Sequence, residues 1–145
     1  DVAIAVDTAR FGLTETRLGL IPATIGPYVV ARMGAAMARR VFFSSRRFDA
    51  TEAVTLGLIA RAVPADQLDA VVEAEVVPYL ACAPGAVTAA KALVRRIAWP
   101  IDDAMIAASI DALIAQWDGD EAAEGIAAFF EKRQPSWALG GCRKA

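Results

Sequence analysis

The sequence predicts an α/β chain that opens with short strands and continues as a run of helices. At the start, Val2, Ile4 and Val6 alternate with alanines, which is typical of a buried strand. From about residue 27 onward, apolar residues recur three and four positions apart, which is the spacing of helices that pack through one face. The composition agrees, because the 33 alanines favour helix.

Two extended pieces are expected at the start, over residues 2–6 and 9–12. Isolated strands are marginally stable, so we expect these two to belong to a sheet whose other strands lie outside this chain. Residues 13–28 follow as a loop or turn system. The residues that favour turns in this segment are Gly19, Pro22, Gly26 and Pro27.

Helix boundaries can be placed at several Pro, Gly and Asp residues in the next part of the chain. A helix over 28–33 is expected to stop at Gly34, and a second is expected over 35–43. Asp49 and Glu52 have the spacing of a helix N-terminus, and Gly57 is placed to end that helix. Residues 58–63 read as a short strand or extended link.

Four more helices are expected after Pro64. The first starts at residues 64–66 and carries Leu68, Val72, Val76 and Leu80 on one stripe. The next three are expected over 84–99, 102–117 and 121–133, and the tail over 138–145 should fray. In the helix over 84–99 we expect these residues to point inward: Val87, Ala90, Leu93, Val94 and Ile97.

Composition excludes several classes of function. The chain has no histidine, so Ser-His-Asp catalysis and His-ligated metals are excluded. A net charge of -2 argues against binding to nucleic acid. Cys82 and Cys142 form no metal-binding spacing, and we expect Cys82 to be buried in a cytoplasmic protein. No apolar run approaches the roughly 20 residues of a membrane span.

Glu15 is the first candidate for chemistry. It follows an extended piece and precedes an irregular loop, and a carboxylate in that position is well placed to face a cleft. The alternative is a solvated loop glutamate beside Arg17, and residue spacing alone favours that alternative.

Four ordered motifs resemble the crotonase superfamily, the enoyl-CoA hydratases and isomerases. Residues 1–5 and 9–22 resemble its central segment, with Phe11-Gly12-Leu13-Thr14-Glu15 as "F-G-x-x-E". Residues 47–58 resemble "R-x-D-A-x-E-A-x-x-x-G-L", followed by Val63-Pro64, and residues 124–133 resemble "EG-x-x-A-F-x-E-K-R". Residues 21–30 resemble the branch that hydrates methylglutaconyl-CoA, although Ala23-Thr24-Ile25 departs from the family's commoner glycine-rich segment.

The resemblance implies the C-terminal part of a crotonase-like (ClpP/crotonase) α/β fold. Residues 1–63 would then end the crotonase core, residues 64–137 would form a predominantly helical trimerisation region, and residues 138–145 a frayed tail. The family's other glutamate and both oxyanion-hole donors would lie outside this chain. We therefore expect the chain to be inactive alone.

The resemblance also implies a reaction and its residues. The reaction is addition of water across the 2,3-double bond of an acyl-CoA thioester, with Glu15 as general acid or base. Leu20 and Pro22 would contact the substrate, while Phe129 and Lys132 would help to hold coenzyme A. For the last two, the alternatives are a core phenylalanine and a lysine capping a helix end.

Coenzyme A would be part of the substrate, and neither a separate cofactor nor a metal is expected. The expected partners are an acyl-CoA thioester and copies of the same chain in a trimer or dimer of trimers. Two other functions stay open: an enoyl-CoA isomerase that uses a single glutamate, and a non-catalytic helical assembly fragment.

Overall fold

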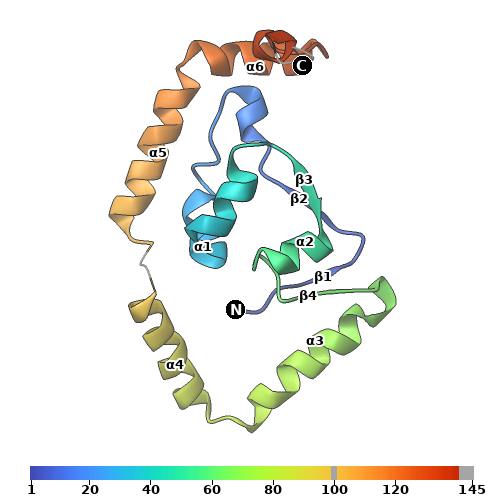
Figure 1. Cartoon of the computed structure of the whole chain (residues 1–145). Helices are drawn as coiled ribbons and strands as arrows, with labels where there is room; N and C mark the ends of the chain where they lie inside the picture. Colours follow the sequence, from blue (N-terminus) through green and yellow to red (C-terminus); the bar gives the residue numbers. More distant parts are fainter. Residues whose placement is uncertain (99–100, 141–145) are drawn as a thin grey trace.

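The structure is a computed structural model that describes residues 1–98 and 101–140. Four short strands and two helices form the centre, and the later helices follow one another around it (Figure 1). The strands are β1 (Ile4–Val6), β2 (Arg10–Gly12), β3 (Arg47–Asp49) and β4 (Arg61–Val63). The α-helices are α1 (Gly26–Phe42), α2 (Ala50–Thr55), α3 (Leu68–Val76), α4 (Pro84–Ile97), α5 (Asp103–Trp117) and α6 (Asp120–Phe130). The 3-10 turns are η1 (Glu15–Leu18), η2 (Ala65–Gln67), η3 (Val77–Ala81) and η4 (Ser136–Gly140).

The two opening strands find partners within the chain. β1 pairs in parallel with β4, with Ile4 opposite Arg61, and β2 pairs antiparallel with β3, with Phe11 opposite Phe48. Backbone hydrogen bonds continue the first pair, because the Asp7 N–H donates to the Val63 carbonyl at 2.8 Å. Each opening strand thus has one partner in a two-stranded sheet within the chain, and the expectation that all of the other strands lie outside it is wrong. The pairing is non-local, and short-range patterns do not encode it.

The core lies between α1, α2 and the strands. Val41 of α1 and Leu56 after α2 are the largest fully buried side chains among the described residues. Phe11 and Phe48 stack across the β2–β3 pair with ring centroids 5.7 Å apart. This core anchors the segment between β2 and α1, which carries Glu15.

The local start and stop signals are confirmed. Gly34 has φ +74°, so α1 is two helical segments joined at a kink, as expected for residues 28–33 and 35–43. The Asp49 carboxylate accepts a hydrogen bond from the Glu52 N–H at 2.8 Å and caps α2. Gly57 takes a left-handed φ of +75° after α2.

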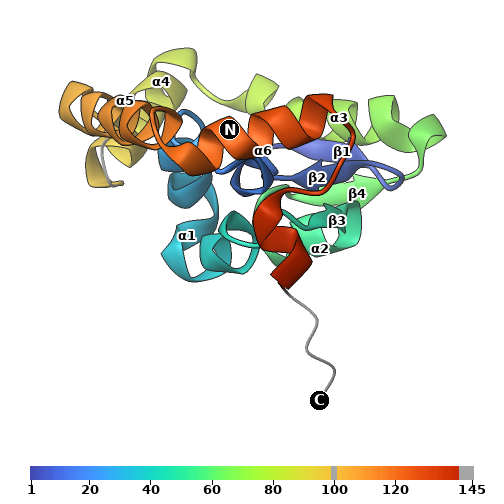
Figure 2. The same cartoon turned by 90° about the horizontal axis from the view of Figure 1, so that it is seen from above.

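The later helices form an arm, residues 68–130, that runs around the centre (Figures 1 and 2). The long helix expected from residue 64 is shorter, since α3 ends at Val76 and a 3-10 turn containing Pro78 follows. The inward face expected for α4 is also wrong. Val87 is half-buried, whereas the rest of that set is exposed: Ala90, Leu93, Val94 and Ile97. Periodicity shows which residues share a face, but not what covers the face.

Three further expectations concern Cys82, membrane spans and the tail. Cys82 is exposed, not buried, and lies between η3 and α4. No single described helix has the length and hydropathy of a membrane span. Residues 65–81 and 84–97 meet that criterion only as a pair, bent by 109°. Trp99, Cys142 and the end of the tail lie outside the described residues.

Candidate active site

Glu15 begins the short turn η1, directly after β2 and the buried Leu13. Its carboxylate oxygen Oε2 is buried and has no hydrogen-bond partner among the described residues. Its backbone carbonyl accepts a hydrogen bond from the Leu20 N–H at 3.1 Å. Glu15 is half-buried, so it is not fully solvated as the alternative interpretation required. A buried carboxylate oxygen without a partner is unusual in a folded protein and calls for an explanation.

Two glycines allow η1 to touch helix α6. Gly19 has φ +68°, and a Cβ added to it would lie 2.6 Å from the backbone nitrogen of Ala122. On the other side of the contact, a Cβ added to Gly125 would lie 2.5 Å from the carbonyl carbon of Leu18. No Cβ fits at either distance, so the backbones of η1 and α6 are in direct contact. Nothing in the local sequence pattern predicts this contact.

The loop after α1 also contacts η1. The Thr16 and Ser45 hydroxyls are hydrogen bonded to each other, and Thr16 Oγ1 also donates to the Phe43 carbonyl at 3.4 Å. Ser45 is buried and has φ +50°, a left-handed conformation that is uncommon for serine. Sequence reasoning missed Ser45, since nothing in the local pattern distinguishes it from a surface serine.

Leu20 and Pro22 are both buried and continue the chain from Gly19. Pro22 lines an apolar cavity of about 720 Å³ between α1 and α5. The other lining residues include Ile21, Val30, Phe42 and Met105, with Ser109 as the only hydroxyl among the described lining residues. The turn that holds Glu15 thus leads directly to an apolar space.

Phe129 and Lys132 lie at the end of α6. Phe129 is 66% exposed and stands edge-to-face against Phe130, with centroids 5.6 Å apart. The alternative that Phe129 is a core residue is therefore wrong. Lys132 is exposed and has φ +54°, and its N–H donates to the Phe129 carbonyl at 3.3 Å. Both side chains are accessible at the end of the same helix that touches η1.

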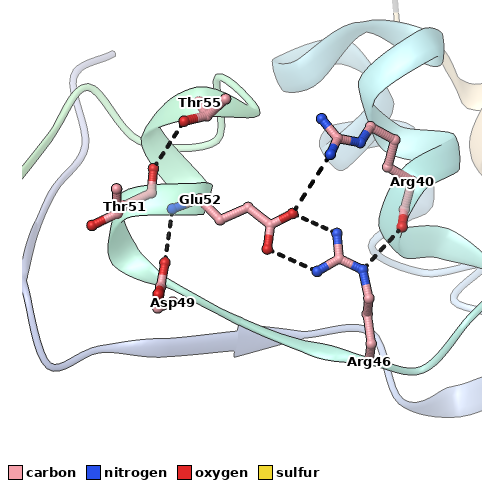
Figure 3. Close-up of polar contacts among 6 residues, drawn as sticks. All are labelled: Arg40, Arg46, Asp49, Thr51, Glu52 and Thr55. Carbon is pink, nitrogen blue, oxygen red and sulfur yellow. Dashed lines mark hydrogen bonds and ion pairs between the residues drawn. The ribbon is translucent and has the colours of Figure 1, made fainter.

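The carboxylate of Glu52 has a structural role (Figure 3). Arg46 donates to both of its carboxylate oxygens, at 2.8 and 2.6 Å, and also donates to the Arg40 carbonyl at 3.3 Å. The hydrogen bonds from Arg46 lower the pKa of Glu52. The Arg46–Glu52 ion pair joins the end of α1 to the start of α2, so Glu52 is not free for proton transfer.

Glu124 is engaged in the same way. Its two oxygens accept hydrogen bonds from Arg133 at 2.7 and 2.8 Å, and one also accepts from the Ser136 N–H at 2.8 Å. These bonds, first from Arg133 and then from Ser136, lower the pKa of Glu124 to about 2. Within residues 1–98 and 101–140, no group of three or more His, Cys, Asp or Glu side chains is arranged to hold a metal ion.

Comparison with known proteins gives a consistent result. The family model described as enoyl-CoA hydratase/isomerase matches residues 1–139. A probable enoyl-CoA hydratase of Mycobacterium bovis is 33% identical over 138 residues, a match that covers 94% of this chain and 54% of the relative. The chain thus spans about half the length of that relative.

Solved structures agree in both fold and coverage. An enoyl-CoA hydratase from Mycobacterium avium is 31% identical with a TM-score of 0.80, covering 94% of this chain and 54% of that one. A carnitinyl-CoA hydratase from the same species is 28% identical, also with a TM-score of 0.80, covering 96% and 55%. The chain has the α/β architecture of these enzymes and is a member of the enoyl-CoA hydratase/isomerase family.

Proposed function

We propose that this chain is the C-terminal half of an enoyl-CoA hydratase domain and that Glu15 is its general acid or base. The observation that carries the proposal is the buried, unpartnered Oε2 of Glu15. Glu52 and Glu124 are neutralised by arginines, whereas Glu15 keeps an oxygen available. An unpaired buried acceptor costs about 1–3 kcal/mol, and a position for a substrate or water proton explains that cost.

The reaction adds water across the C2–C3 double bond of an enoyl-CoA thioester. The water oxygen bonds to C3 and loses a proton, the thioester carbonyl carries the resulting enolate charge, and C2 takes a proton. Glu15 would hold one of the protons in transit. The second carboxylate and the backbone donors that stabilise the enolate would come from the part of the domain that this chain lacks. For that reason the chain alone is proposed to be inactive.

Substrate contacts are proposed on both sides of Glu15. Leu20 and Pro22 lead from the glutamate toward the apolar cavity, which suits an acyl group. Phe129 presents an accessible ring for an adenine, and Lys132 supplies a point charge for phosphate. A methylglutaconyl-like acyl group is proposed from the sequence of residues 21–30.

We further propose that copies of the chain associate through the arm. Large apolar side chains along α4 and α5 are exposed in the single chain, among them Leu93, Ile97, Ile110 and Trp117. Exposed apolar surfaces of this kind usually mark contacts with other proteins. A trimer or dimer of trimers is the expected assembly, and a cytoplasmic location stays a prediction.

The test joins this chain to the unmatched part of the M. bovis relative and assays the chimera with crotonyl-CoA. Hydration removes the ultraviolet absorbance of the conjugated thioester. We expect turnover by the chimera, none by the 145-residue chain, and a loss of at least about a hundredfold in Glu15→Gln. A Glu73→Gln variant, on the exposed side of α3, is the control and should keep full turnover. Turnover that survives in Glu15→Gln would refute the role of Glu15.

The same chimera separates the two alternative functions. With a 3-enoyl-CoA, an isomerase creates the conjugated absorbance that a hydratase removes, so the sign of the signal distinguishes them. A helical assembly fragment would instead form oligomers, seen by size-exclusion chromatography with light scattering, without turnover of either substrate.

A further inference from the structure

We infer that helices α5 and α6 position Glu15, through Gln116 and Gly125. This inference rests on the proposed function, because it assigns positioning residues to the same glutamate. Neither residue is placed in contact with the substrate. Their contacts are with the backbone of the turn that carries Glu15.

The first contact is a hydrogen bond between distant parts of the chain. The Gln116 side-chain amide donates to the Gly19 carbonyl at 2.8 Å across a sequence separation of 97 residues. The bond is partly buried and therefore partly protected from competing water. It attaches the end of α5 to the residue that terminates η1.

The second contact is the close approach of two backbones. α6 meets η1 with a small-residue face, where Ala122, Gly125 and Ala128 are all buried. The lack of a Cβ at Gly125 lets α6 lie against the Leu18 carbonyl. Even one methyl group at that position would force the helix and the turn apart.

These contacts reach Glu15 through one closed turn. Gly19 precedes Leu20, whose N–H donates to the Glu15 carbonyl at 3.1 Å, and the Gly19 N–H donates to the Thr16 carbonyl at 3.4 Å. Moving Gly19 therefore moves both ends of the turn. Within the described part of the chain, no hydrogen bond to Oε2 of Glu15 acts beside the turn in setting the position of this residue.

The arm is therefore connected through η1 to Glu15, the residue proposed to transfer a proton. The arm also exposes apolar residues, including Ile114 and Trp117 next to Gln116. A molecule that binds to these exposed residues contacts α5, the helix that is hydrogen bonded to Gly19 at the end of η1. A displacement of about 1 Å is enough to lower catalytic rates a hundredfold in well-aligned sites.

The test uses Gly125→Ala and Gln116→Met, each with a matched control. Gly85→Ala introduces the same methyl group in α4, where nothing lies within 4 Å, and Gln67→Met makes the same change at an exposed position. Amide hydrogen exchange is measured in the 145-residue chain and in the chimera. We expect exchange at Gly19 and Leu20 to rise about tenfold in both test variants and in neither control.

Kinetics of the chimera give the second readout. We expect kcat with crotonyl-CoA to fall by about ten- to a hundredfold in Gly125→Ala and Gln116→Met, with little change in KM. A purely structural role would reduce the active fraction, so exchange would rise equally in β1 and β4, and that result would overturn the inference. Unchanged exchange at Gly19 and Leu20 in both variants would overturn it as well. If the unsubstituted chimera has no turnover, the proposed function fails, and the exchange data still decide whether the arm holds the turn.

Discussion

Replacement of Gly19 by alanine should destabilise the protein far more than the same replacement at Gly57. Both glycines have left-handed backbones, with φ +68° and +75°, so alanine meets the same backbone cost of about 1 kcal/mol at each. They differ in their surroundings. A Cβ at Gly57 meets nothing within 4 Å, whereas a Cβ at Gly19 would lie inside the backbone of Glu121 and Ala122.

The additional cost at Gly19 follows from what α6 loses when it is pushed away. Ala122 and Ala128 are 0% and 1% exposed, and re-exposing two methyl groups costs roughly 1.6 kcal/mol at about 0.8 kcal/mol each. The hydrogen bond from Gln116 to the Gly19 carbonyl contributes about 1 kcal/mol more. We therefore expect Gly19→Ala to cost about 2–3 kcal/mol more than Gly57→Ala.

Urea denaturation followed by circular dichroism measures the free energy of unfolding of both variants and of the unsubstituted chain, and a thermal melt gives their melting temperatures. For a chain of this size the difference corresponds to a melting temperature lower by about 5–10 °C in Gly19→Ala than in Gly57→Ala. Equal midpoints for the two variants would show that α6 does not rest on η1, and the reasoning about that contact would then fail.

Three further predictions concern ion pairs and a thiol. Hydrogen bonds from Arg133 lower the pKa of Glu124 to about 2, so this pair should stabilise the fold above the ordinary pKa of 4.5 and lose that effect as the pH falls toward 2. The urea midpoint of Glu124→Gln should therefore lie below that of the unsubstituted chain at neutral pH and converge with it near pH 2. A gap that stays constant with pH would contradict this. Arg46→Lys keeps the charge but loses the bidentate hydrogen bonds to Glu52, so its thermal midpoint should fall by a few degrees. An unchanged midpoint would show that this ion pair is dispensable for stability. Cys82 should react with a thiol reagent in the native chain, as peptide mapping against Cys82→Ser would reveal, and protection until unfolding would contradict its exposure.

Much of the local structure was predictable because its causes are local. Asp49 caps α2 and Asp102 caps α5 through hydrogen bonds to amides three residues ahead. Gly34 interrupts α1 and Gly57 follows α2, each with a backbone conformation that favours glycine. Neighbouring residues suffice for such signals.

Predictions that depended on distant parts of the chain failed or stayed open. Pairing of β1 with β4 joins residues 57 positions apart, so the strands looked unpartnered in sequence. Leu93 and Ile97 have the spacing of a buried face, yet they are exposed because no element of the described chain covers them. Cys82 lies in an apolar stretch of the sequence but is exposed in the fold.

The sequence by itself determined the family, several helix boundaries and Glu15 as the candidate, because these depend on residue types at short and fixed spacings. Only the tertiary structure decided that Oε2 of Glu15 is buried without a partner, while Glu52 and Glu124 are held by arginines. It also decided that Gly19 and Gly125 bring α6 against the turn that carries Glu15. The ion pairs join residues 6 and 9 positions apart, but their geometry depends on how the chain turns between helices. The contact of α6 with the turn joins segments about 100 residues apart and arises from backbone contact, which local sequence patterns do not record.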